Sequence, residues 1–204
     1  KVMATLHETN FTLPGQAEEV YRGKVGDRYT LEHEGQDLVA IVRTDRISAY
    51  DRVLPDTIPH KGQVLNQMSA NLLKAASKGI DEIPTWLIET PDPNVSLGYS
   101  ATPFKLEMIM RGHLLGSAWK AYDEEDMRDL TGNKLPNGMS EFQRFDTPLL
   151  TPTTKADKGH DENISPAEII EQGLATEEEL YRLTTMSHVL FMRGMAAAAK
   201  RGLV

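Results

Sequence analysis

The chain has 204 residues, of which 40% are hydrophobic and 25% are charged, and its formal net charge at pH 7 is -8. A chain of this length buries a sizeable core and is expected to form one domain or two closely joined lobes. The acidic balance argues against a general nucleic-acid or acidic-membrane binder, because such proteins present a basic face. It leaves room for a small anionic ligand held by a few local cations.

Cysteine is absent from the sequence, which excludes disulfides, thiolate metal sites and a cysteine nucleophile and agrees with a reducing compartment. No apolar run approaches the roughly 18 residues that a membrane span needs, and no signal-peptide pattern opens the chain. We therefore expect a cytoplasmic protein. Because the chain opens on Lys1 rather than Met and stops where a new apolar segment begins, we also expect a longer parent protein.

The first third of the chain predicts strands. Residues 20–33 and 37–44 are short runs rich in Val, Tyr and Ile, joined by the turn-like residues 34–36. Residues 62–79 place apolar side chains at helical intervals and end on Gly79, which predicts an amphipathic helix. Its apolar positions are Val64, Leu65, Met68, Leu72 and Leu73. Residues 89–103 are expected to be a loop because Pro, Asp, Asn and Gly dominate them.

Residues 103–112 alternate strictly, which predicts a strand with two different faces. One face carries Phe104, Leu106, Met108 and Met110, and the other carries Lys105, Glu107, Ile109 and Arg111. The three charged groups either face solvent or line a polar cleft. From the alternation alone, the solvent-facing strand is the simpler interpretation.

The second half of the chain predicts helices around one long loop. Residues 117–130 form a helix with Ser117 as N-cap, and residues 133–155 form a loop rich in Pro and Thr. Residues 165–168 have the form of a helix start, because Ser at the N-cap, Pro at N1 and Glu at N3 satisfy free backbone groups.

A last long helix is expected from Thr176 to about Lys200, with acidic residues at its start and Gly202 just beyond its end. Its apolar residues are most simply core. These are Leu180, Leu183, Leu190 and Met195. Strands first and helices later predict an α+β arrangement of two lobes rather than a βαβ repeat.

The residues "RGKVGDRY" (22–29) place Gly23 and Gly26 between two predicted strands. Turn residues without side chains let backbone N–H groups approach a phosphate closely, and Lys24 adds positive charge. The motif is neither a Walker A nor a complete GxGxxG sequence, so a plain hairpin turn is the alternative.

The residues "RTDRISAYD" (43–51) follow a strand directly. They carry Asp45, Arg46, Ser48 and Asp51 where the strand gives way to a loop. Sites often form at such positions because the scaffold holds the loop residues in place. The alternative is a turn in which Asp and Ser bond their own backbone.

The residues "RGHLLGSAWKAY" (111–122) join Arg111 to the predicted helix start at Ser117. The free N–H groups and positive dipole of a helix N-terminus suit a phosphate or carboxylate, and Arg111 is able to grip the same anion bidentately. A capped surface helix is the alternative, and capping is compatible with ligand binding.

A metal site has weak support, since His160 and Asp161 form one His among carboxylates without regular spacing. The chain has no nucleophile elbow of the GxSxG type and no HExxH motif. Together the motifs indicate a site with several separate anion-binding groups and no covalent nucleophile.

Five segments resemble those of the SAICAR synthetase family in order and approximate spacing, from about Val20 to the chain end. They read "RGKVGDRY", "TDRISAYD", "IPHKGQVLNQ", "RGHLLGSAWKAY" and "TPTTKADKGHDENIS". Five motifs in order are far more specific than any one of them.

The resemblance implies an ATP-dependent ligase of purine biosynthesis that joins the carboxylate of the ribonucleotide CAIR to the amino group of L-aspartate. The products are SAICAR, ADP and phosphate. The implied fold is α+β with two lobes and an ATP cleft between them: an N-terminal antiparallel β lobe over residues 1–110 and a C-terminal α+β lobe over 111–204, incomplete here. Expected partners are small molecules, with no nucleic acid or membrane, and assembly into a homo-oligomer stays open.

By resemblance, Gly23, Lys24 and Val25 belong to the loop over the ATP phosphates, and Glu107 lies on the strand that lines the nucleotide cleft. By the same resemblance, the polar face of residues 105–111 is expected to line this cleft. Arg111 and Ser117 are expected to grip the ribonucleotide phosphate. The residues expected to hold or border the ribonucleotide are Ser48, Asp51, Lys61, Gly62, Arg111 and Ser117.

Residues 155–168 are expected to contribute to the active site and also to contain the start of a helix. By resemblance, its "HDENIS" segment lies at the active site, where Lys155, Asp161 and Asn163 position substrate around L-aspartate. Asp161 is expected to meet the incoming amine, and Lys155 a carboxylate.

Two departures from the family pattern bear on activity. The family has Arg where this chain has Gly26, which weakens the grip on phosphate unless Arg28 substitutes. Family members also continue with acidic segments associated with Mg²⁺–ATP, so metal ligands are not assigned. The 204 residues alone are not expected to make a competent enzyme, and we favour a longer parent over an inactive remnant.

Two other functions stay open. One is a kinase-like phosphotransferase that uses a similar ATP site on another acceptor, which the "HDENIS" segment argues against. The other is a nucleotide-binding relative that has lost catalysis. Its only support is Gly26 and the fact that this sequence does not contain the acidic segments.

Overall fold

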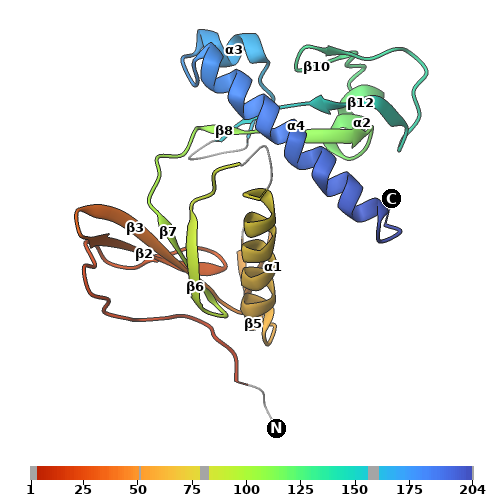
Figure 1. Ribbon diagram of the computed structural model, residues 1–204. Coiled ribbons are helices and arrows are strands. Elements are labelled where there is room, and N and C mark those ends of the chain that lie inside the picture. The colour runs from red at the N-terminus through yellow and green to blue at the C-terminus, as the bar shows by residue number, and fades with distance from the viewer. Residues whose placement is uncertain (1–3, 51, 79–82, 156–160, 204) are drawn as a thin grey trace. The chain divides into compact units, whose positions relative to one another are not determined.

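The computed structural model describes residues 4–50, 52–78, 83–155 and 161–203 (Figure 1). The chain divides into two compact units, Lys1–Thr102 and Pro103–Val204. The α+β class expected from the sequence is confirmed. The expected lobe boundary at residues 110 and 111 lies within the second unit, and the role assigned to each lobe stays a prediction.

A five-stranded antiparallel sheet forms the centre of the first unit. In spatial order its strands are β1 (Tyr21–Arg22), β2 (Gly26–His33), β3 (Gln36–Arg43), β7 (Val95–Tyr99) and β6 (Leu87–Asp92). The hairpin of β2 and β3 turns at Glu34 and Gly35, whose φ angles are 51° and 77°. Positive φ at both central residues matches the right-handed twist of paired strands, so this predicted turn is confirmed.

The expected loop over residues 89–103 is wrong. Most of it belongs to the hairpin of β6 and β7, which turns at Pro93 and Asn94. The Asn94 N–H donates to Asp92 Oδ1 at 2.9 Å, a local turn bond that Asp favours. The turn residues were therefore identified correctly, but pairing with β3 converts their flanks into strands.

A third hairpin and one helix are also described in this unit. The hairpin comprises β4 (Arg46–Ala49) and β5 (Arg52–Thr57), and the helix is α1 (Lys61–Ala76). Helix α1 contacts β3, β6 and β7 (Figure 1). The predicted helix is thus confirmed, although it ends at Ala76, before the expected end at Gly79.

Helix α1 turns an unexpected face toward the sheet. Its buried residues are Gly62, Asn66 and Ala70, whereas most of the predicted apolar stripe is exposed. The exposed members are Val64, Leu65, Met68 and Leu72. Asn66 is satisfied on the buried side, since Ser96 Oγ donates to its Oδ1 at 2.8 Å. Small and amide side chains let the helix approach the strands closely.

In its described residues, the second unit consists of short antiparallel pairs and three helices. The pairs are β9 (Met110–His113) with β12 (Arg144–Leu150), β8 (Leu106–Glu107) with β13 (Thr153–Thr154), and β10 (Asp129–Leu130) with β11 (Asn133–Lys134). The helices are α2 (Ser117–Asp123), α3 (Pro166–Glu171) and α4 (Glu177–Ala199). Among the helices of the described residues, none is long and apolar enough to cross a membrane.

Three expectations about this unit are wrong in extent. The helix from 117 ends at Asp123, and its N-cap is Gly116 rather than Ser117. The expected loop over 133–155 contains β12 and β13, because these residues pair with strands that lie more than 30 positions earlier. The strand expected over 103–112 is interrupted between β8 and β9, yet Leu106 and Met108 do pack in one apolar cluster.

The two expected helix starts are confirmed in detail. Ser165 with Glu168, and Thr176 with Glu179, each form a reciprocal capping box. Helix α4 ends at Ala199, and Gly202 follows with a φ of 68°. Its expected core residues are only partly correct. Leu180 is buried, Leu183 and Met195 are half-buried, and Leu190 is exposed.

Candidate functional site

The loop of Gly23, Lys24 and Val25 connects β1 to β2. It closes through a bond from the Gly23 N–H to the Gly26 carbonyl at 2.9 Å. An added Cβ at Gly26 would lie 2.9 Å from the Val42 carbonyl oxygen, so a side chain there requires the neighbouring strand to shift. The backbone is therefore tightly turned at the position where a phosphate-binding loop is predicted.

Arg46 lies beneath this loop and contacts its backbone. The guanidinium Nη2 donates to the Gly23 carbonyl at 2.8 Å, and Nε donates to the Lys24 carbonyl at 3.3 Å. Nη1 donates to the carbonyl of His7. Arg46 was noted in the sequence only as part of a candidate loop motif, and nothing in the local pattern indicated these contacts.

Asp27 holds Arg46 in place. Arg46 Nη2 lies 2.8 Å from Asp27 Oδ1, and the two side chains are 6% and 0% exposed. Burial raises the pKa of Asp27, but the hydrogen bonds from Arg46 and Thr9 outweigh burial, and the net pKa is lowered. Such a pair loses several kcal/mol if one partner is removed, because the other charge stays buried.

The start of α1 is fixed by Asp45. Its Oδ1 accepts from the Gly62 N–H at 2.9 Å, and its Oδ2 accepts from the Leu6 N–H at 2.8 Å. An added Cβ at Gly62 would lie 2.2 Å from the Arg43 carbonyl oxygen. Gly62 thus has a packing reason to be glycine, and its predicted place beside the ribonucleotide stays a prediction.

Lys61 lies in a pocket next to the loop. The pocket is lined by Val25, Arg43, Thr44, Lys61, Leu65 and Ser69. It brings Val25, predicted to contact ATP, together with Lys61, predicted to border the ribonucleotide. Two cationic side chains, Arg43 and Lys61, make this pocket suited to an anion.

Ser48, Asp51 and Arg28 also belong to the predicted site residues of this unit. Ser48 is half-buried in β4, opposite Val53 of β5. Asp51 lies outside the described residues. Arg28, considered as a substitute for the missing Arg at 26, has its guanidinium 5.0 Å from the centroid of the Tyr21 ring. Its predicted phosphate role is not tested.

In the second unit, Lys155 joins two carboxylates. Its Nζ lies 2.5 Å from Glu107 Oε1 and 3.6 Å from Asp161 Oδ2. The hydrogen bond with Glu107 is the main cause that raises the pKa of Lys155, followed by the charge of Asp161. Glu107, predicted to face the nucleotide, is thereby brought together with two residues predicted to position L-aspartate.

Backbone pairing explains why these segments meet. The Lys155 N–H donates to the Lys105 carbonyl at 2.8 Å, which continues the pairing of β13 with β8. On the other side of β13, the Thr154 N–H donates to the Glu162 carbonyl at 2.8 Å, and Thr153 pairs with Asn163. The segment of Glu107, which is distant in sequence, therefore lies beside β13, and the segment of Glu162 and Asn163 lies on the other side of β13.

Arg111 is held by two hydroxyl groups. Its Nε donates to Thr151 Oγ1 at 2.8 Å, and its Nη2 donates to Ser117 Oγ at 3.0 Å. Burial lowers the pKa of Arg111, but an arginine stays charged at any physiological pH. The Ser117 hydroxyl is thus paired with Arg111 rather than capping α2, and the two predicted phosphate ligands are brought together.

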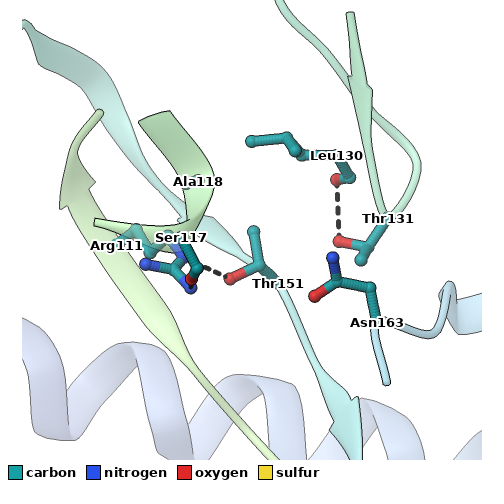
Figure 2. Close-up of a pocket in the computed structure, with 7 residues that line it drawn as sticks. All are labelled: Arg111, Ser117, Ala118, Leu130, Thr131, Thr151 and Asn163. Carbon is teal, nitrogen blue, oxygen red and sulfur yellow. Dashed lines mark hydrogen bonds between the residues drawn. The ribbon is translucent and has the colours of Figure 1, made fainter. Parts of the chain in front are cut away.

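A pocket opens beside Arg111 and Ser117 (Figure 2). It is lined by Arg111, Ser117, Ala118, Leu130, Thr131, Thr151 and Asn163. A second pocket shares Leu130, Thr131 and Asn163 with it and reaches the capping residues Ser165 and Glu168. Asn163 therefore lies with the predicted phosphate grip. The sequence did not indicate Thr131, which follows a predicted helix, and Thr151 was noted only as the first residue of the "TPTTKADKGHDENIS" motif, without a role at the site.

No metal centre is evident in the described parts of the chain. Across residues 4–50, 52–78, 83–155 and 161–203, no three His, Cys, Asp or Glu side chains are grouped so that they could hold a metal ion. His160, considered with Asp161 as a metal ligand, lies outside these ranges.

The comparisons with known proteins agree on one family. A family model described as SAICAR synthetase matches residues 19–204. The phosphoribosylaminoimidazole-succinocarboxamide synthase of Bacteroides fragilis is 51% identical over 203 residues, which is 99% of this chain and 62% of that protein. That of Bacteroides thetaiotaomicron is 50% identical with the same coverage. The chain thus spans less than two thirds of these relatives.

The solved structures agree with this assignment. A SAICAR synthase from Saccharomyces cerevisiae in complex with SAICAR superposes with a TM-score of 0.75 at 31% identity, covering 94% of this chain and 67% of that one. The predicted resemblance, first made from five short motifs, is confirmed by a match that includes them all. The chain therefore belongs to the SAICAR synthetase family.

Proposed function

We propose that the protein is an ATP-dependent ligase that joins the carboxylate of CAIR to the amino group of L-aspartate, giving SAICAR, ADP and phosphate. The observation that carries this proposal is the meeting of Arg111, Ser117 and Asn163 around one pocket. In this pocket, the proposed phosphate ligands Arg111 and Ser117 lie beside Asn163 of the "HDENIS" segment. Family membership supplies the reaction class.

The chemistry requires positioning more than covalent catalysis. A carboxylate is a poor electrophile because its negative charge repels an amine. Transfer of the γ-phosphoryl group of ATP to the CAIR carboxylate forms an acyl phosphate and releases ADP. The aspartate amine then attacks that carbonyl carbon, phosphate leaves, and the amine loses a proton. The protein's task is to hold three anionic substrates and offset their charge.

The nucleotide is assigned to the loop of the first unit. Gly23, Lys24 and Val25 contact the ATP phosphates, and their tight backbone turn supports this role. Glu107, predicted to line the nucleotide cleft, also accepts a hydrogen bond from Lys155. The assignment of Glu107 to the nucleotide therefore links ATP with the residues proposed for L-aspartate.

The ribonucleotide is assigned to two sets of residues. Arg111 and Ser117 bind its phosphate, and their mutual hydrogen bond presents a preformed grip. The residues assigned to the rest of the ribonucleotide are Ser48, Asp51, Lys61 and Gly62. Lys61 has the strongest support among them, because it lies in a pocket with Arg43.

L-Aspartate is assigned to Lys155, Asp161 and Asn163. The Lys155 ammonium is suited to a substrate carboxylate, and Asp161 to the incoming amine. Both groups lie within reach of each other, 3.6 Å apart. A substrate with one amine and two carboxylates matches this alternation of charge.

Magnesium is proposed as the partner of ATP, but the described residues do not fit a metal site of their own. No step is therefore assigned to the ion here. The proposed role also implies a cytoplasmic location and small-molecule partners.

The assay uses the full-length protein with CAIR, L-aspartate and Mg²⁺–ATP, and measures ADP and SAICAR together. We expect both products in equal amounts, and neither SAICAR nor sustained ADP formation beyond the first turnover when L-aspartate is omitted. ADP formation that persists without L-aspartate would favour the kinase-like phosphotransferase. ATP binding without ADP formation would favour a non-catalytic relative.

A further inference from the structure

The carbonyl groups of the predicted phosphate loop all point toward one side. Those of Gly23 and Lys24 accept from the Arg46 guanidinium at 2.8 and 3.3 Å. That of Val25 accepts from Thr44, whose N–H and Oγ1 lie 3.2 and 3.0 Å away. Three successive carbonyls are therefore occupied by donors from the single segment 44–46.

This arrangement decides where the amide hydrogens point. The described chain contains no cis peptide bond, and in a trans peptide the N–H points opposite to the preceding C=O. Because the Gly23 and Lys24 carbonyls face Arg46, the N–H groups of Lys24 and Val25 are directed away from it. Successive backbone N–H groups with a common direction form an anion-binding concavity.

Arg46, the donor to these carbonyls, is itself buried and held by further bonds. The Arg46 side chain is 6% exposed, and it is bonded to Asp27, which is 0% exposed and also accepts from the Thr9 N–H at 2.7 Å. Each of the three guanidinium nitrogens donates to a protein oxygen, so this buried group is committed to the loop and to Asp27 rather than to a ligand. The loop geometry is therefore set before any ligand arrives, which is the condition for preorganised electrostatic stabilisation.

The pocket next to the loop, assigned above to the ribonucleotide, adds positive charge to this part of the first unit. Val25 and Thr44 line it together with the cationic side chains of Arg43 and Lys61. The loop's outward amides and these two cations belong to the same region of the first unit.

We propose that Arg46, held by Asp27, is a positioning residue for the nucleotide: with Thr44 it fixes the loop carbonyls so that the amides of Lys24 and Val25 face the polyphosphate of ATP. This inference rests on the proposed function for the identity of the ligand. Arg46 does not contact the substrate in this scheme, and its effect reaches ATP through the loop backbone.

The test measures ATP binding to the full-length protein by calorimetry, together with the KM for each substrate. Arg46→Lys and Thr44→Val are the informative variants, because each keeps its volume and removes defined bonds to the loop. We expect ATP affinity to fall about tenfold for Arg46→Lys and a few-fold for Thr44→Val, as loss of one or two hydrogen bonds implies. The KM for CAIR is expected to stay within about twofold.

Arg22→Met is the matched control. Arg22 Nη1 also reaches Asp27, at 3.2 Å, but its side chain is 37% exposed, and no bond from it to the loop carbonyls is seen in the described chain. We expect its ATP affinity to stay within about twofold of wild type. Amide NMR shifts of Lys24 and Val25 on ATP addition should be large in wild type and reduced in the two loop variants.

Equal ATP affinity in wild type, Arg46→Lys and Thr44→Val would overturn the inference, as would a parallel rise in every KM, which indicates general loss of structure. The ligase proposal fails separately. A wild type that binds ATP through these amides but forms no SAICAR leaves the positioning role standing and removes the assigned reaction.

Discussion

The Lys155 ammonium bridges two carboxylates from different segments, lying 2.5 Å from Glu107 Oε1 and 3.6 Å from Asp161 Oδ2. The pKa of Lys155 is raised by these partners, chiefly by the hydrogen bond with Glu107. Since the folded pKa lies above the unfolded one, the associated stability is present at neutral pH and is lost only as pH rises through the raised value. Lys155 thus carries its charge at neutral pH.

Replacement of Lys155 by Met should reduce catalysis more than stability. We expect kcat/KM for L-aspartate to fall by about a hundredfold, because a charged substrate loses its positioning group. The melting temperature should change little, since half-exposed ion pairs contribute little to stability. Steady-state kinetics and calorimetry measure the two effects. Lys134→Met, at an exposed position of β11, is the matched control and should leave both unchanged.

Thr151→Val tests the proposed binding of the ribonucleotide phosphate by Arg111. Thr151 Oγ1 accepts from Arg111 Nε at 2.8 Å, and valine keeps the shape while it removes the acceptor. We expect the KM for CAIR to rise about threefold to tenfold, as loss of one hydrogen bond to a charged group implies. The KM for ATP should stay constant. If the KM for ATP changed instead of the KM for CAIR, the placement of Thr151 at the proposed CAIR site would be contradicted.

Gly62→Ala should destabilise the first unit. A Cβ at this position would lie 2.2 Å from the Arg43 carbonyl oxygen, which is backbone and cannot turn aside. We expect a loss of about 1–3 kcal/mol, in the range for overpacked cores, measured by urea denaturation. Gly194→Ala in α4 is the control, since no atom lies within 4 Å of its added Cβ. That change should stabilise the helix by about 0.5–1 kcal/mol.

The lowered pKa of Asp27 predicts that the protein loses folding stability in acid. Its folded pKa is lowered from the ordinary value of 3.8, so its stabilising contribution is present above that value and is lost as pH falls through the folded pKa. We expect the wild type to lose stability below about pH 4, and Asp27→Asn to be less stable by about 3–5 kcal/mol at neutral pH. The difference between the two proteins should shrink in acid. Denaturation series from pH 7 to pH 3 test this, and a constant difference would contradict it.

Local chemistry made the helix starts and one hairpin predictable from the sequence. The capping boxes of Ser165 with Glu168 and Thr176 with Glu179 involve residues three positions apart, so the same bonds are available in any context. The turn at Gly35 likewise depends on its own backbone freedom. The family resemblance also came from the sequence, because five ordered motifs carry it.

The apolar stripe of α1 shows the limit of periodicity. The spacing of Val64, Leu65, Met68 and Leu72 correctly predicts a helix, but it does not say which face meets the sheet. Gly62 and Asn66 occupy that face, because the helix lies close to strand backbone and Asn66 has partners there. The expected loop over 89–103 failed for a related reason, since its strands form only by pairing with distant neighbours.

The sequence by itself determined the family, the helix caps and the set of candidate site residues. Only the tertiary structure decided which of them meet. Lys155 reaches Glu107 across 48 positions, and Arg46 reaches the carbonyls of Gly23 and Lys24 across 23 and 22 positions. Such bonds depend on strand pairing that places distant segments side by side, and no local periodicity encodes that placement.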